Sequence, residues 1–157
     1  MAAQNTFSSK TTTFTWKTDS SAGDIPAHVY YGERDDAQHP IGKSIKYSDC
    51  NANTHIALMF HAGGFVMGST DMIPRNQVDY LVSKGFVVVL VAYRLAPQVD
   101  IASGPVQDAK DVYGWAQNQL PNLMKESAGV QPDGTRIVSI GYSAGALLAL
   151  TTVSSMI

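Results

Sequence analysis

The sequence predicts an α/β fold with a mostly parallel sheet, helices on both faces of the sheet and an antiparallel edge at its N-terminal end. Short apolar runs rich in β-branched residues occur at 56–60, 86–93 and 137–140. Such continuous runs are typical of strands that helices cover on both faces. A segment with helical spacing follows each run, and this alternation indicates parallel strands joined by right-handed crossovers.

Length and composition are those of one globular domain. The 157 residues are 45% hydrophobic and 15% charged, which is enough apolar material for a buried core. The net charge of -2 provides no basic field, so no nucleic acid partner is expected. No stretch approaches the roughly 18 to 20 apolar residues of a membrane span. The single cysteine, Cys50, cannot form an internal disulfide, which favours a cytoplasmic location.

The N-terminal third predicts a loose arm and then two paired strands. Residues 1–12 are rich in Ser, Thr and Asn without periodicity, so we expect an arm, and a domain that spans 13–157. Alternating residues from Thr13 predict one strand, S-S-A-G supplies turn residues, and 25–32 predicts a second, antiparallel strand. Most residues between that strand and the first buried run have the chemistry of a loop.

Two long helices are expected between the buried runs. The first, at 72–84, places Val78 and Val82 at helical spacing and ends before a glycine. The second, at 106–120, carries its large apolar side chains on one face. Residues 121–134 are expected to form a loop around a short helical segment.

Ser143 occupies the turn between the last apolar run and the helix that follows it. G-Y-S-A-G has the G-x-S-x-G spacing, in which two glycines let the backbone turn sharply and hold a serine hydroxyl at the carboxyl edge of a sheet. The helix that begins at Ala144 directs unpaired N–H groups toward an oxyanion beside this serine. Ser143 is therefore a candidate nucleophile for acyl transfer, and an ordinary loop serine is the alternative.

A second glycine-rich turn, H-A-G-G-F at 61–65, follows the first buried run. The backbone N–H groups of Gly63 and Gly64 could stabilise the oxyanion from one side while the Ala144 amide acts from the other. Ligands of parallel sheets bind beyond the carboxyl ends of the strands, so this turn and Ser143 are expected at the same edge. A plain strand-to-helix turn is the alternative.

Four motifs together resemble the hormone-sensitive-lipase branch of the α/β-hydrolase esterases. They are H-A-G-G-F at 61–65, Y-R-L-A-P-Q at 93–98, the pair Asp108 and Trp115, and G-Y-S-A-G at 141–145. The resemblance implies an α/β-hydrolase-like fold that hydrolyses small-molecule carboxylic esters without a cofactor or metal. It implies these site residues: Ser143 as nucleophile, Gly63, Gly64 and Ala144 as oxyanion hole, and His61 and Asp108 as supporting residues. The sequence departs from the family pattern at Ala62, Phe65 and Gln98.

The chain lacks two residues that the family's triad requires. The triad continues from the serine to an Asp or Glu and then a His, and the fourteen residues after Ser143 contain neither, so we expect a C-terminally truncated domain. His61 is expected to anchor the oxyanion turn, and His28, His39 and His55 to be surface or strand residues. A serine hydroxyl without a base is a weak nucleophile, so the chain alone is expected to be inactive.

Several functions remain open at this point. The chain is interpreted first as part of a serine esterase, and second as part of a thioesterase or peptidase with the same residues, because fold and nucleophile do not fix the acyl substrate. A non-catalytic binding or interaction protein derived from a hydrolase is the third possibility. The strand at 136–142 would be left as a sheet edge beside an apolar helix, which predicts self-association or a complementing C-terminal polypeptide.

Overall fold

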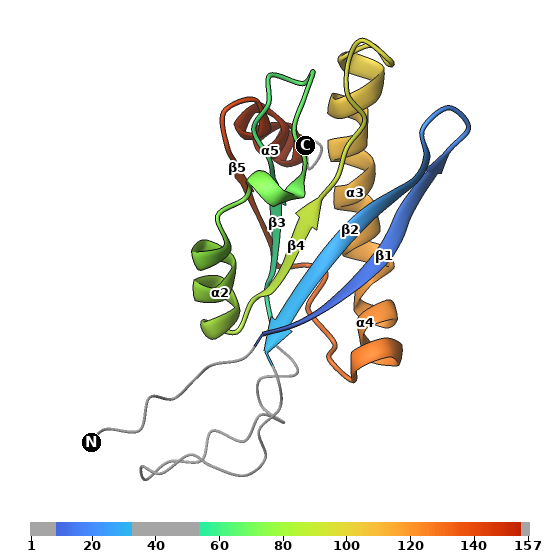
Figure 1. The fold of residues 1–157 in the computed structure, drawn as a ribbon. Helices are drawn as coiled ribbons and strands as arrows, with labels where there is room; N and C mark the ends of the chain where they lie inside the picture. Colours follow the sequence, from blue (N-terminus) through green and yellow to red (C-terminus); the bar gives the residue numbers. More distant parts are fainter. Residues whose placement is uncertain (1–8, 33–53, 155–157) are drawn as a thin grey trace, which may run out of the picture.

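The computed structural model describes residues 9–32 and 54–154, which form one sheet with helices on both faces (Figure 1). The five strands are ordered β1-β2-β4-β3-β5. Their bounds are Ser9–Asp19 for β1, Gly23–Gly32 for β2, Ile56–Phe60 for β3, Val87–Val91 for β4 and Ile137–Gly141 for β5. β3 pairs in parallel with β4 and β5, while β2 pairs antiparallel with β4 and β1. The predicted fold class and its antiparallel N-terminal edge are confirmed.

β1 begins at Ser9, so four residues that we assigned to a loose arm belong to the first strand. Residues 9–12 pair with 29–32 of β2. The Ser9 hydroxyl also donates to Asp79 at 3.1 Å and accepts from Arg75 at 2.7 Å. These long-range contacts and the β propensity of threonine explain why the strand begins before the alternation of apolar and polar residues does. The remaining residues of the predicted arm lie outside the described residues.

The described residues contain four α-helices: α2 (Arg75–Ser83), α3 (Gln107–Asn118), α4 (Leu120–Ala128) and α5 (Ala144–Ser154). Short helical turns at Thr70–Met72 and Ala102–Val106 precede α2 and α3. α2 begins later than the spacing predicted because proline disfavours helical geometry in the residue before it, and Pro74 becomes the N-cap. The short helical segment expected within 121–134 is α4, which ends at Gly129 with a φ of 67°.

Both faces of the central strands β3 and β4 are buried. Helices α3, α4 and α5 pack on one face, against Ile56, Leu58 and Phe60 of β3 and the β4 side chains that point the same way. Helix α2 covers the other face, against Ala57 and Met59. Alternate residues of β3 and β4 therefore enter opposite layers, which explains why these two strands contain no polar residue. β5 contains Ser139 and is only partly buried, so the third run is not the fully covered strand that its apolar residues indicated. The two-sided packing confirms the predicted arrangement of helices.

β5 forms one edge of the sheet within the described part of the chain, where it pairs with β3 alone. Its neighbour α5 is apolar on two sides. Leu148 and Thr152 are buried, whereas Leu147, Leu150 and Val153 are exposed. An exposed strand edge next to exposed apolar side chains is a surface on which proteins associate.

Candidate active site at the carboxyl edge of the sheet

Ser143 lies on the turn between β5 and α5 and is exposed to solvent. Its φ of 53° is in the left-handed region, which residues other than glycine rarely adopt. Two backbone hydrogen bonds of 2.9 Å hold the turn, from Gly145 N to Tyr142 O and from Ala146 N to Ser143 O. The serine therefore has the strained conformation that the G-x-S-x-G spacing predicts.

Close backbone contacts explain why both flanking positions are glycine. A Cβ atom on Gly141 would lie 2.0 Å from the carbonyl oxygen of Gly145. One on Gly145 would lie 2.4 Å from the carbonyl oxygen of Phe60 and 2.6 Å from that of His61. The first turn of α5 thus lies directly against the ends of β3 and β5, with no room for a side chain between them.

The glycine-rich turn at 61–65 follows β3, which is the neighbour of β5. Phe60 and Gly141 are partners in the parallel ladder, and Tyr142 N donates to Phe60 O at 3.1 Å one residue further on. Because the strands run in the same direction and in register, they bring this turn and Ser143 to neighbouring positions at the carboxyl edge.

The turn itself depends on left-handed residues. The φ values of Gly63, Gly64 and Phe65 are 133°, 62° and 67°. A Cβ on Gly63 would lie 1.8 Å from the carbonyl oxygen of Met67, so only glycine fits there. A positive φ is unusual for a bulky residue such as Phe65, whose carbonyl accepts a 2.8 Å hydrogen bond from Ala96 N.

The N–H groups of Gly63, Gly64 and Ala144 have no acceptor among the residues that the structure describes. Two of these donors belong to the turn after β3, and the third belongs to the first residue of α5. The N-terminal end of a helix also carries a partial positive charge. Such donors can stabilise negative charge that develops on a carbonyl oxygen next to Ser143.

His61, the first residue of the glycine-rich turn, is buried. Its ring stacks on Tyr93 with 4.2 Å between centroids, and its Nδ1–H donates to Ala62 O at 2.6 Å. The Tyr93 hydroxyl donates to the His61 carbonyl at 2.8 Å. Burial lowers the pKa of His61, and the hydrogen bond to Ala62 opposes this shift only in part. The ring is therefore neutral near pH 7, and its contacts support an anchoring role.

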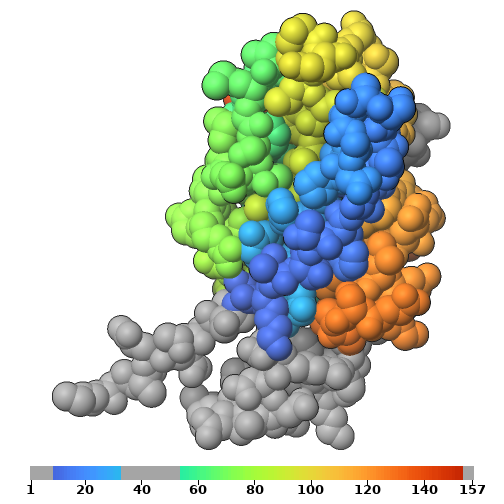
Figure 2. Space-filling view, turned by 45° about the vertical axis from the view of Figure 1, so that its right-hand side comes forward, coloured from blue at the N-terminus to red at the C-terminus, as the bar shows by residue number. Residues whose placement is uncertain are grey.

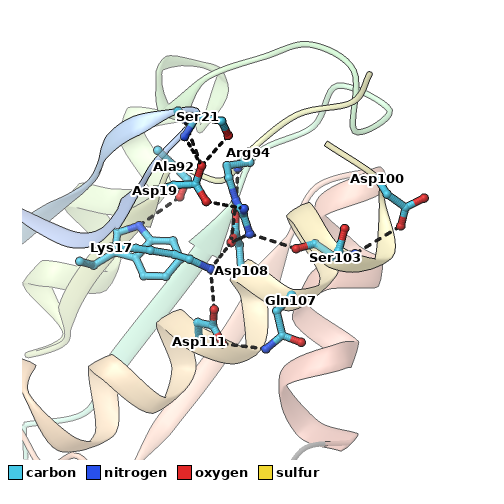
Figure 3. Close-up of polar contacts among 12 residues, drawn as sticks. Lys17, Asp19, Ser21, Ala92, Arg94, Asp100, Ser103, Gln107, Asp108 and Asp111 are labelled. Carbon is cyan, nitrogen blue, oxygen red and sulfur yellow. Dashed lines mark hydrogen bonds and ion pairs between the residues drawn. The ribbon is translucent and has the colours of Figure 1, made fainter. Parts of the chain in front are cut away.

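Asp108 is completely buried and binds two cations (Figure 3). It accepts hydrogen bonds from the Arg94 backbone N–H at 2.9 Å, from Arg94 Nη2 at 2.7 Å and from Lys17 Nζ at 2.7 Å. None of its recorded contacts reaches the turn at 61–65 directly. Its partner Arg94 lies in the segment 93–96, in which the Tyr93 hydroxyl donates to His61 O and Ala96 N donates to Phe65 O. Asp108 is thus connected to the turn at 61–65 only through this segment.

Three residues of this ionic network were not recognised in the sequence. Arg94 lies within the quoted motif at 93–98, but nothing in that motif identifies its partners. Lys17 and Asp19 are ordinary polar residues of an edge strand, and they lie 91 and 75 residues from the charged groups that they bind. Only the folded chain brings these charges together.

The other described histidines lie away from Ser143. His55 precedes β3 at the opposite end of that strand, and His28 belongs to β2, which β4 and β3 separate from β5. His28 Nδ1 is 3.0 Å from the Thr13 hydroxyl. The fourth histidine, His39, lies outside the described residues.

Within residues 9–32 and 54–154, no group of three or more His, Cys, Asp and Glu side chains is placed to hold a metal ion. The helices in these ranges are all too short or too polar to cross a bilayer.

Comparison with known families identifies the fold. The sequence profile of the alpha/beta hydrolase fold matches residues 57–156, from β3 to the end of α5. The chain belongs to the alpha/beta hydrolase fold family. The match includes both turns of the site and confirms the resemblance that the four motifs indicated.

Solved esterases share the fold of this hydrolase-family chain. An esterase from Pyrobaculum calidifontis superposes with a TM-score of 0.62 at 26% identity, over 95% of this chain and 40% of the esterase. The carboxylesterase EstE1, from a metagenomic library, gives the same TM-score at 27% identity, over 95% of this chain and 42% of that one. The chain therefore spans less than half the length of these enzymes.

Segments of polyketide synthases are more similar to this chain in sequence than these esterases are. The chain is 41% identical over 127 residues to the non-reducing polyketide synthase mapC of Penicillium brevicompactum, which is 78% of this chain and 5% of the synthase. It is 38% identical over 125 residues to the non-reducing polyketide synthase ausA of Emericella nidulans, which is 80% of this chain and 5% of that protein. The chain spans only a small fraction of each synthase.

Proposed function

We propose that this hydrolase-fold chain carries the nucleophile and the oxyanion hole of a serine hydrolase that transfers acyl groups from carboxylic esters to water. The conformation of Ser143 carries the proposal. A serine with a φ of 53° follows a strand and precedes a helix, between two glycines that backbone contacts require. The similar fold of solved esterases supports the same reaction class.

In this reaction the Ser143 hydroxyl oxygen attacks the acyl carbonyl carbon. Negative charge then develops on the carbonyl oxygen, and the N–H groups of Gly63, Gly64 and Ala144 stabilise it by donating hydrogen bonds. Removing one such donor typically costs about 2.7 to 4 kcal/mol of transition-state stabilisation. When the oxyanion collapses, the ester C–O bond breaks and the alcohol leaves with the proton that the general base took from the serine hydroxyl. Water then attacks the acyl-serine, and the acid is released as Ser143 regains its proton.

The general base comes from outside the described residues. His61 is buried, stacked on Tyr93 and bonded through Nδ1, while the other described histidines lie away from this edge. The large synthases that resemble the chain, and the esterases more than twice its length, support the inference that a further stretch of polypeptide provides the base. Alone, this chain is then a poor catalyst.

External imidazole tests this proposal because it can replace the missing base. We expect a fluorophosphonate probe to label the 157-residue chain no faster than its Ser143→Ala variant in plain buffer. Added imidazole should then accelerate labelling in proportion to its concentration, with the adduct located on Ser143 by mass spectrometry.

Ser83→Ala is a suitable control, because Ser83 is an exposed serine at the end of α2. It should leave the imidazole-dependent rate unchanged. Equal labelling of the wild-type chain and Ser143→Ala at every imidazole concentration would contradict a nucleophilic role. That outcome would instead favour a non-catalytic binding protein.

A thioester substrate is the second candidate, and the polyketide synthase relatives favour it. The same nucleophile and oxyanion donors serve both substrates, because both reactions pass through a tetrahedral oxyanion. Matched oxygen and thiol esters of one short acid would distinguish them. For each ester, the Ser143-dependent rate is the rate with the wild-type chain minus the rate with Ser143→Ala. If the thioester is the substrate, this rate for the thioester divided by that for the oxygen ester should exceed the same quotient for imidazole without protein.

We also propose that the additional polypeptide covers β5 and α5. Without it, the chain is expected to self-associate at micromolar concentration and to bind a hydrophobic dye, because an unpaired strand edge lies beside exposed Leu147, Leu150 and Val153. Analytical ultracentrifugation measures the association. Leu150→Glu should weaken it, whereas Tyr80→Glu, at an exposed position on α2, should not. A monomer that binds no dye would contradict this part of the proposal.

A further inference from the structure

The segment at 93–96 contacts both ends of the glycine-rich turn at 61–65. Tyr93 stacks on His61 and donates to its carbonyl at 2.8 Å, and Ala96 N donates to the Phe65 carbonyl at 2.8 Å. These contacts fix the residues on either side of Gly63 and Gly64. The position of this segment therefore sets the position of the proposed oxyanion donors.

The side chain of Arg94, in the middle of the segment, is held from two other parts of the fold (Figure 3). Its Nη2 lies 2.7 Å from Asp108 on α3 and donates to the Ser103 carbonyl at 3.0 Å. Its Nη1 lies 2.7 Å from Asp19 at the end of β1. Both the Arg94 and the Asp19 side chains are largely buried, so these charged hydrogen bonds are sheltered from solvent.

Asp19 uses its two oxygens for different tasks. Oδ1 accepts hydrogen bonds from the Ser21 backbone, the Ser21 hydroxyl and the Ala22 backbone, at 2.9, 2.6 and 3.1 Å, and so shapes the β1–β2 turn. Oδ2 binds Arg94. One carboxylate therefore joins the tip of the hairpin to the segment 93–96, which contacts the turn at 61–65.

Lys17 makes a second connection from the same strand. Its Nζ lies 2.7 Å from Asp108 and 2.5 Å from Asp111, and so joins β1 to α3. Trp16 Nε1 adds a hydrogen bond of 3.2 Å to the Ala92 carbonyl, directly before the segment. In the space-filling view, the tip of the blue hairpin lies against the yellow part of the chain that contains these partners (Figure 2).

We propose that the β1–β2 hairpin positions the glycine-rich turn at 61–65. Asp19 and Lys17 of the hairpin act through Arg94 and Asp108, and Arg94 belongs to the segment that contacts this turn. Asp19 and Lys17 are positioning residues and touch no reacting atom. The coupling rests on geometry alone, and only its role in catalysis rests on the proposed function.

Asp19→Asn tests the coupling and leaves the hairpin turn largely intact. Asparagine keeps one acceptor oxygen for Ser21 and Ala22, and its NH₂ group, which cannot accept a hydrogen bond, then faces the Arg94 guanidinium. Two amides report on the turn, because Met67 N donates to Gly63 O at 3.1 Å and Ala96 N donates to Phe65 O at 2.8 Å. We expect their protons to exchange with solvent about tenfold faster, because losing a charged hydrogen bond loosens the turn locally. Hydrogen exchange of dilute protein, resolved to single residues by fragmentation in a mass spectrometer, measures this.

Asp24→Asn is the matched control on the same hairpin. It makes the same change of charge, but Asp24 binds the Thr18 hydroxyl at 2.7 Å and has no recorded contact with Arg94. Exchange at Met67 and Ala96 should stay at the wild-type rate in this control. Amides of α2 in each variant correct for any change in global stability.

Lys17→Met provides an independent second variant and should also speed exchange at Met67 and Ala96. Wild-type exchange at these two amides in both Asp19→Asn and Lys17→Met would overturn the proposal. So would equal acceleration in Asp24→Asn after the α2 correction. Absence of Ser143 labelling in imidazole would refute the proposed function and leave this exchange result unchanged, so the two failures are distinguishable.

Discussion

Gly145→Ala is expected to lower the free energy of unfolding by about 3 kcal/mol, the upper part of the usual range for overpacking a filled site. The added Cβ would lie 2.4 Å from the Phe60 carbonyl oxygen and 2.6 Å from that of His61. Both obstacles are backbone atoms, so no side chain can rotate away. The end of β3 and the first turn of α5 would have to separate. Urea unfolding followed by circular dichroism measures the loss.

Gly114→Ala is the matched control for this experiment. Gly114 lies in α3, and a Cβ there would meet no atom within 4 Å. Alanine also favours a helix over glycine by about 1 kcal/mol, so this variant should be slightly more stable than the wild-type chain. If Gly145→Ala unfolded at the wild-type urea concentration, the close approach of β3 and α5 would be wrong.

The sequence predicted those parts of the fold that local patterns determine. The first two apolar runs became β3 and β4, whose residues are all buried, because a continuous apolar strand is stable only between two layers of helices. The third run became β5, but it contains Ser139 and is only partly buried. The G-x-S-x-G turn was also predictable, because it needs glycine on both sides within five residues. Here a short piece of sequence and a local geometry determine each other.

Features that depend on distant partners were missed. The start of β1 carries no apolar alternation, and its contacts with Arg75 and Asp79 of α2 involve residues that are far away in sequence. The network around Arg94 has the same origin, because Lys17 and Asp19 reach their partners only after the hairpin has packed on α3. The local spacing of charged residues in the sequence does not predict contacts of this kind.

The position of Asp108 explains why one more substitution should have a large effect. Its side chain is 0% exposed and binds both Arg94 and Lys17. Asp108→Ala would leave the Arg94 guanidinium with one carboxylate, Asp19, and a cavity where the fully buried carboxylate had been. Removing one partner of a buried ion pair typically costs about 3 to 5 kcal/mol, and we expect a loss of that size in urea unfolding.

Asp111→Ala is the control that separates the effect of burial from the effect of losing a negative charge. Asp111 also binds Lys17, at 2.5 Å, but its side chain is 38% exposed, and water can replace much of the lost contact. Its removal should cost less than about 1 kcal/mol, the usual limit for exposed ion pairs. Equal losses for the two variants would show that charge balance alone stabilises this region. A large loss for Asp108→Ala alone would show that burial decides the effect, as expected if this carboxylate holds Arg94 and the segment that contacts the turn at 61–65.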